Sequence, residues 1–330
     1  VRHFLNYQLK DGKIDKYLLL LGNGMSFPDK LKEWQDRDFI PTFGYPGSDV
    51  LLSAGLAGEN LNTPAFRTGR LSAATNQQVL AYLNKLKEFE KAPPTLSAKN
   101  ILHLSGGKST FEINDLKAVL QGLVPLVQNS YLGGAVQSIV KQTVEPVENV
   151  SIAKQVNEGV GLITFMGHAS PTVPDLNIGY VSSPTSQLSN KGRYPFMYFN
   201  GCGVGNVFYQ YETLASDWLL TPDKGAIGVL SNSYWSYASI SAHYLTALYS
   251  ALFGQENMLG KPIGEILQKV SNTIATTKDN DYDIANVHQL ILLGDPAVVL
   301  FKINKPDFAI SDKDIFLQSA SLTQPIGQAD

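Results

Sequence analysis

The chain has 330 residues, of which 44% are hydrophobic and 17% are charged, and its formal net charge at pH 7 is −3. This composition excludes a disordered or fibrous protein, and the length allows two domains of ordinary size. A weakly acidic chain without a run of Lys or Arg is not expected to bind nucleic acid. No apolar run approaches the roughly 18 residues that a membrane-spanning helix needs, so we expect no transmembrane segment.

Apolar segments of strand length alternate with segments of helical period along the chain. This alternation is typical of an α/β protein in which helices flank a mostly parallel sheet. The expected strands are residues 17–21, 66–71, 101–104, 135–141, 160–166, 195–200, 226–230 and 289–293.

The helix expected after the strand at residues 66–71 ends at a boundary between two structural units. A capping box at Thr75 and Gln78 predicts where it begins, and Pro93 and Pro94 predict its end. The helical period disappears after residue 303. The expected units are an α/β subdomain over residues 1–94, incomplete at its N-terminus, a second α/β subdomain over 95–303, and a tail or the start of a β-rich domain over 304–330.

Cys202, the single cysteine, follows the expected strand that ends at Asn200 and stands among three glycines. A free cysteine is most often a small buried residue of the core. The glycines, however, allow a sharp turn and leave room beside the sulfur. Because ligands of parallel α/β sheets bind beyond the carboxyl ends of the strands, we interpret Cys202 as a reactive thiol.

His168 has an equivalent position, because it follows the expected strand that ends at Met166 and precedes a long loop. The other four histidines are expected to be structural. If the two strands are adjacent and parallel, the imidazole and the thiol of Cys202 face one crevice, where the thiol becomes an activated nucleophile. The backbone N–H groups of Ala169 and Cys202 are then candidates to bind a developing oxyanion.

Other chemistry is weakly supported by the sequence. Glu112, Asp115 and Asp175 are candidates to orient His168, but each also fits a solvated or helix-capping carboxylate. Two glycine-rich segments partly match nucleotide-binding motifs, but each lacks one glycine that its motif requires. They are Gly106-Gly107-Lys108 and the segment around Cys202. Without a cysteine pair or an H-E-x-x-H motif, no metal site and no cofactor are predicted, and a structural calcium ion is left open.

With these residues in view, the chain resembles the gingipain-type cysteine peptidases, a bacterial family with a caspase-like fold that includes peptidases which process secretion signals. Five blocks carry the resemblance in the same order along the chain. They are YLLLLGN with IPTFGYPGSD and TGRLSAAT, then GLITFMGHAS, PFMYFNGCGVGNVF, GAIGVLSNSYWS and LLGDPAVVLF.

The resemblance implies two side-by-side α/β subdomains, of which residues 95–303 are catalytic. It implies that His168 and Cys202 catalyse cleavage of protein or peptide substrates and that the protein is exported. Ala169 stands where the family usually has glycine, and the family's acid after the first catalytic strand is missing, so a Cys-His dyad is expected. The residues implied to flank or line the substrate pocket are Asn200, Gly201 and Trp235.

Three functions therefore remain open. The leading one is a cysteine endopeptidase that forms an acyl-enzyme intermediate. The alternatives are a transpeptidase that processes secreted proteins and an inactive peptidase-like binding module. The sequence sets neither the oligomeric state nor the residue that is preferred at the scissile bond. Family members that cleave after Arg or Lys carry a carboxylate in the substrate pocket, and Glu112 and Asp115 lie near the corresponding segment.

Overall fold

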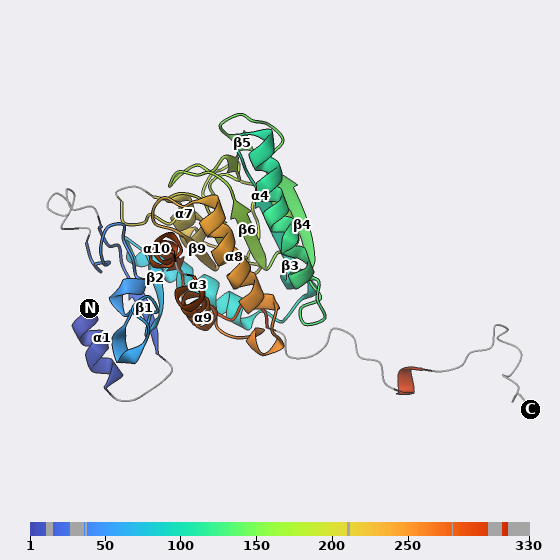
Figure 1. The fold of residues 1–330 in the computed structure, drawn as a ribbon. Coiled ribbons are helices and arrows are strands. Elements are labelled where there is room, and N and C mark those ends of the chain that lie inside the picture. Colours follow the sequence, from blue (N-terminus) through green and yellow to red (C-terminus); the bar gives the residue numbers. More distant parts are fainter. Residues whose placement is uncertain are drawn as a thin grey trace, which may run out of the picture.

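The computed structural model describes residues 1–10, 16–26, 36, 38–209, 212–278, 280–302 and 312–315. Except for 312–315, the expected tail over residues 304–330 lies outside the described residues. The rest is a mixed α/β structure whose large, mostly parallel sheet is flanked by helices (Figure 1). The predicted fold class is therefore confirmed.

All of the expected strands are present, with ends that differ from the predicted ones by at most two residues. The strands are β1 (Tyr17–Leu21), β2 (Arg67–Leu71), β3 (Asn100–Ser105), β4 (Ala135–Val140), β5 (Glu148–Asn149), β6 (Leu162–Met166), β7 (Leu176–Asn177), β8 (Phe196–Asn200), β9 (Gly228–Asn232) and β10 (Leu290–Leu293). The short pair β5 and β7 was not expected.

Helices connect most of these strands. The α-helices are α1 (Arg2–Leu9), α3 (Asn76–Lys91), α4 (Thr110–Gly122), α5 (Val124–Val127), α6 (Ala153–Glu158), α7 (Leu214–Leu220), α8 (Ala238–Phe253), α9 (Ile263–Thr277) and α10 (Asp281–Gln289). The 3₁₀ helices are η2 (Val50–Leu52), η3 (Leu56–Gly58), η4 (Leu96–Lys99), η5 (Glu256–Met258) and η6 (Asp312–Asp314). Within the described residues, none of the helices combines the length and the apolar character that crossing a membrane requires.

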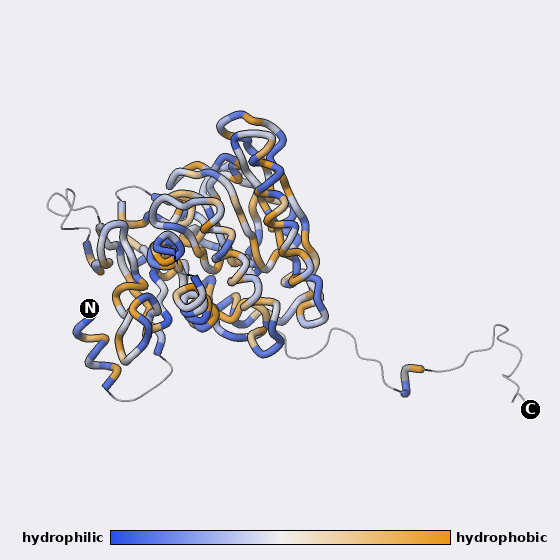
Figure 2. The backbone as a smooth tube through the Cα atoms, in the orientation of Figure 1, coloured by the Kyte–Doolittle hydropathy of each residue, from blue (hydrophilic) through white to orange (hydrophobic). Residues whose placement is uncertain are grey.

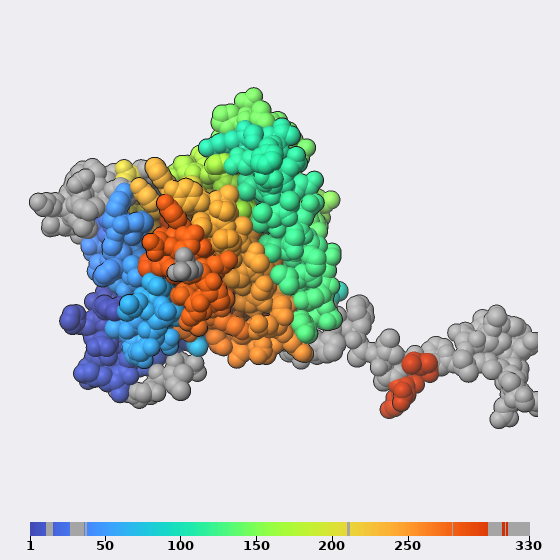
Figure 3. Space-filling model, viewed as in Figure 1, coloured from blue at the N-terminus to red at the C-terminus, as the bar shows by residue number. Residues whose placement is uncertain are grey.

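Eight strands form one continuous sheet in the order β1-β2-β10-β9-β8-β6-β3-β4. All neighbours are parallel except β9 and β10, which run antiparallel. The strands of residues 1–94 meet those of residues 95–303 edge to edge, because the backbone of Arg70 pairs with that of Leu293. Figure 3 accordingly shows the N-terminal segment on one side of the molecule and the segment around α4 and β4 on the other.

The central strands separate two hydrophobic cores, one on each face of the sheet. Successive side chains of a strand point to opposite faces, so in β6 Leu162 and Met166 pack into one core and Ile163 and Phe165 into the other. Helices α4, α5, α8 and α9 cover the first core, and α3, α6 and α7 cover the second. Hydrophobic and hydrophilic residues alternate along the covering helices in Figure 2, as expected for helices with one buried face.

Candidate active site

His168 and Cys202 leave the sheet at matching positions on neighbouring strands. Strands β6 and β8 are parallel, and their last paired residues are Met166 and Asn200. Each candidate residue lies two positions beyond its member of that pair, so both reach the same edge of the sheet. Both also line one small pocket of about 40 Å³. The expected convergence of imidazole and thiol is therefore present in the structure.

The loop before α8 fixes the position of the Cys202 sulfur. The Cys202 thiol donates to the Ser236 carbonyl oxygen at 3.6 Å, and Sγ accepts a hydrogen bond from the Ser236 N–H at 3.5 Å. Gly203, the next residue, has a φ of 69° and donates its N–H to the Tyr234 carbonyl at 2.9 Å. A glycine suits this left-handed conformation, which turns the chain sharply after the thiol and leaves Cys202 only partly buried.

Glu112 is the carboxylate that contacts His168. Its Oε1 lies 2.8 Å from His168 Nε2, and its Oε2 accepts the Lys108 N–H at 2.7 Å. Partial burial raises the pKa of Glu112, but the hydrogen bonds from Lys108 and His168 outweigh this effect and hold the pKa below its usual value. At neutral pH, a charged carboxylate therefore fixes the orientation of the imidazole.

This contact differs from the expected Cys-His pair without an acid. Glu112 occupies the third position of α4, which Ser109 caps by accepting the Glu112 N–H. A glutamate at this position normally bonds back to the cap residue. Here it bonds to Lys108 instead, which leaves its second oxygen for His168. The sequence alone offered three carboxylates, and the exposed Asp115 is not the one that lines the pocket.

Asp175 supports the site from behind rather than touching the imidazole. Its Oδ2 accepts the Gly107 N–H at 2.7 Å, and its own N–H donates to the His168 carbonyl at 2.8 Å. Lys141 lies 4.0 Å from the same carboxylate, and both side chains are buried. A Cβ at Gly106 or Gly167 would fall within 2.7 Å of Asp175 Oδ1, which explains why neither position carries a side chain.

The same contacts weaken the nucleotide-binding alternative at Gly106-Gly107-Lys108. A phosphate loop needs free backbone N–H groups. Here the Gly106 N–H donates to the Met166 carbonyl, the Gly107 N–H to Asp175, and the Lys108 N–H to Glu112. Within the described residues, no group of three or more His, Cys, Asp or Glu residues is placed to hold a metal ion.

The turns that carry Ala169 and Cys202 lie against each other. A Cβ at Gly201 would fall 2.6 Å from the Ala169 Cβ, so only glycine fits at this contact. Neither the Ala169 N–H nor the Cys202 N–H donates to another residue in the described part of the chain. Both groups are therefore available to a carbonyl oxygen placed beside the sulfur.

The three residues expected around the substrate have different surroundings. Asn200 and Gly201 line the pocket, whereas Trp235 does not. The Trp235 side chain is 70% exposed and stacks on Tyr234 with the ring centroids 5.4 Å apart. It is therefore not a core aromatic residue, and it lies on the surface one residue before Ser236, which holds the sulfur.

Comparisons with known proteins identify the family and the fold of the chain. The model of peptidase family C25 matches residues 1–301. The chain belongs to this family. The C25 chain is thus a cysteine peptidase, a hydrolase that acts on proteins or peptides. A comparison with curated protein sequences found no match.

Solved structures with the same fold are also found for this C25 peptidase. One is the Arg-specific cysteine proteinase gingipain R, with a TM-score of 0.70 and 16% identity over 91% of this chain and 67% of that one. Another is the complex of the pro- and mature domains of RgpB from Porphyromonas gingivalis, with a TM-score of 0.71 and 16% identity over 91% and 69% of the two chains. At this identity the matches show a shared fold.

Proposed function

We propose that this C25 peptidase cleaves peptide bonds through a covalent intermediate on Cys202. The observation that carries the proposal is the convergence of Cys202 and the Glu112–His168 pair in one pocket. His168 takes the proton of the Cys202 thiol, Sγ attacks the carbonyl carbon, and the N–H groups of Ala169 and Cys202 bind the resulting oxyanion.

His168 then gives a proton to the leaving amine as the carbon–nitrogen bond breaks, which leaves a thioester on Cys202. Water attacks the thioester and its carbon–sulfur bond breaks. The carboxylic acid product leaves, and the free thiol of Cys202 is regenerated. An amine that takes the place of water would yield a new peptide bond, so added amines distinguish transpeptidation from hydrolysis. By family resemblance we also propose that the protein is exported, which fractionation of producing cells would test.

Digestion of a mixed peptide library tests the proposed function. We expect new N-termini to appear by mass spectrometry when the chain is added. Prior treatment of the chain with iodoacetamide should abolish them, since Cys202 is the only cysteine. A folded chain that produces no cleavage would instead support the alternative of an inactive binding module.

Replacing Glu112 by glutamine is expected to lower kcat by about 10- to 100-fold with little change in KM. Glutamine keeps the size and one hydrogen bond but removes the charge that orients His168. Steady-state kinetics of Glu112→Gln against the wild type measure this effect. Glu148→Gln is a matched control, because Glu148 is another carboxylate with a lowered pKa but binds Gln142 and Thr143 away from the pocket.

The pH dependence of the same variant gives a second readout. The pKa of Glu112 lies below its ordinary value of 4.5, so the carboxylate stays charged at every pH above that value. The ratio of wild-type to Glu112→Gln kcat should therefore be constant above about pH 5 and shrink only in more acidic buffer. Equal kcat values for the two proteins at neutral pH would contradict the positioning role of Glu112.

A further inference from the structure

The pocket beside Cys202 restricts the substrate side chain that can enter it. On the proposed function, Sγ attacks the carbonyl of one substrate residue, and that residue's Cβ lies two bonds from the attacked carbon. Its side chain must then enter the hollow that Cys202 and His168 share, which measures about 40 Å³. Since one water-sized probe needs roughly 10–15 Å³, this hollow holds about three non-hydrogen atoms.

The walls of the pocket leave little room for a longer side chain. Leu116 of α4 and Met166 of β6 line it and are 4% and 2% exposed, because both pack into the first hydrophobic core. On the side of α8, the hydroxyl groups of Ser236 and Ser241 are bonded to each other. Enlarging the pocket would disturb closely packed groups on both sides.

Asn200 also lines the pocket, but its unbonded amide nitrogen is closed off from it. The Asn200 side chain is 3% exposed, and its Oδ1 accepts a hydrogen bond from Asn232 Nδ2 at 3.1 Å. Its Nδ2 is buried and has no partner in the described part of the chain. Because this nitrogen has almost no accessible surface, a hydroxyl group held in the pocket does not reach it.

We infer that this C25 peptidase cleaves after small side chains, up to about the size of threonine. Alanine, serine and threonine have one, two and three side-chain heavy atoms, which the pocket accommodates. Arginine, lysine and phenylalanine exceed the pocket in size.

A peptide series that differs only at the residue before the scissile bond tests this inference. We expect kcat/KM for alanine, serine and threonine to exceed that for arginine, lysine and phenylalanine by at least about 100-fold. Preferred cleavage after a basic or aromatic residue would overturn the inference but leave the proposed function intact. Absence of any cleavage, together with an unreactive Cys202, would instead reject the proposed function itself.

Two leucines of α4 provide a matched pair of variants. Leu116 and Leu120 are both buried in the first core, but only Leu116 lines the pocket. Leu116→Ala should raise cleavage after leucine relative to serine by at least about tenfold. Leu120→Ala creates a comparable core defect and should leave this ratio unchanged. The same ratio in both variants would show that Leu116 does not limit the side chain.

A third variant does not depend on a defect in the core. Ala238 lines the pocket but is exposed at the first position of α8, so a larger side chain there is tolerated by the fold. Ala238→Leu should fill the pocket and lower cleavage after threonine and serine relative to glycine by about tenfold. An unchanged ratio would place the substrate side chain outside this pocket and overturn the inference.

Discussion

Replacing Cys202 by alanine is expected to lower kcat/KM for peptide cleavage by at least about 10⁴-fold. The chain has no other thiol, and the proposed covalent step begins at this sulfur. Alanine should leave the fold intact, because the sulfur bonds only weakly to the Ser236 peptide, at 3.5–3.6 Å. Initial rates on one peptide and melting temperatures of both proteins provide the measurement.

Replacing His168 by alanine should lower kcat/KM almost as much as Cys202→Ala does. The double variant should lose little more activity than either single variant, because the two residues act as a unit. His243→Ala is a matched control, since His243 is another partly exposed histidine that bonds to a carboxylate, Asp283, at 2.9 Å. It lies outside the pocket and should retain wild-type activity. Retention of more than a tenth of the activity in Cys202→Ala would contradict the proposed role of the thiol.

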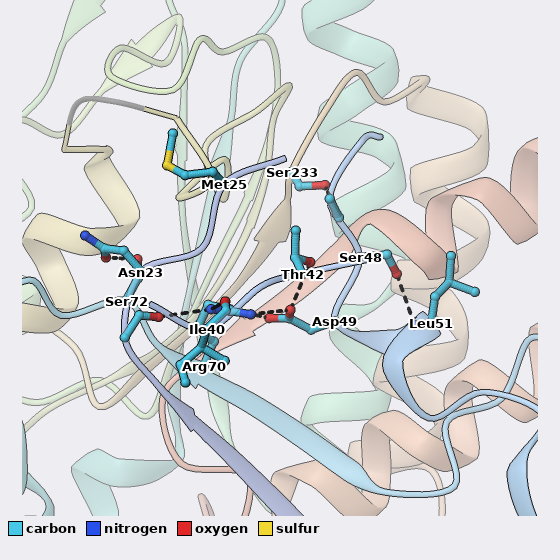
Figure 4. Close-up of polar contacts among 12 residues, drawn as sticks. Asn23, Met25, Ile40, Thr42, Ser48, Asp49, Leu51, Arg70, Ser72 and Ser233 are labelled. Atoms are coloured by element: carbon cyan, nitrogen blue, oxygen red, sulfur yellow. Dashed lines mark hydrogen bonds and ion pairs between the residues drawn. The ribbon is translucent and has the colours of Figure 1, made fainter. Parts of the chain in front are cut away.

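Replacing Arg70 by methionine is expected to lower the free energy of unfolding by about 3–5 kcal/mol, because it leaves the buried charge of Asp49 unpaired. The Arg70 side chain is fully buried, and its Nε and Nη2 donate to the two Asp49 oxygens, each at 2.7 Å (Figure 4). Its Nη1 also donates to the carbonyls of Gly22 and Ile40. Urea unfolding of Arg70→Met and the wild type measures the difference.

Two further variants separate the buried charge from the loss of side-chain bulk. Arg67→Met, three residues earlier on β2, removes an arginine that lies 4.0 Å from the partly exposed Glu265 and bonds to Gln268 and Tyr17, and it should cost less because it leaves no fully buried charge unpaired. Adding Asp49→Leu to Arg70→Met should recover part of the lost stability, since no unpaired charge then remains. A cost for Arg70→Met no larger than that for Arg67→Met would contradict this account.

The Arg70–Asp49 pair also connects the N-terminal strands to the site. Asp49 belongs to a segment in which the Gly47 carbonyl accepts a hydrogen bond from Ser233, and Tyr45 contacts Tyr234 ring to edge at 5.7 Å. Ser233 lies among the residues pictured with this pair in Figure 4. Residues 1–94 therefore help to hold the loop whose backbone contacts Cys202.

Much of the fold could be predicted from local patterns. Buried strands of a parallel sheet are continuous apolar runs bounded by glycine, so β6 and β8 were recognisable from the sequence. Their adjacency was a condition of the proposed site and not a result of the sequence patterns, and it is visible only in the structure. The antiparallel direction of β10 and its pairing with β2 were not predictable in this way, because both depend on contacts between distant segments.

The site could be predicted less completely than the sheet. Glu112 has a visible local role in the first turn of α4, and its contact with His168 arises only when α4 packs beside β6. Asp175 lies in a loop without regular pattern, and its burial follows from Lys141 and two glycines on other segments. Sequence patterns give the type of a side chain and its element, whereas these contacts depend on tertiary packing.

Covalent labelling of the intact chain tests the central claim most directly. A short peptide that carries an electrophilic ketone in place of the scissile bond should add once, at Cys202, as seen by intact mass and peptide mapping. The rate should fall strongly in His168→Ala and in the urea-unfolded chain, because both lose the arrangement that activates the sulfur. Equal labelling rates in all three, or no adduct on the folded wild-type chain, would contradict a catalytic pairing of His168 with Cys202.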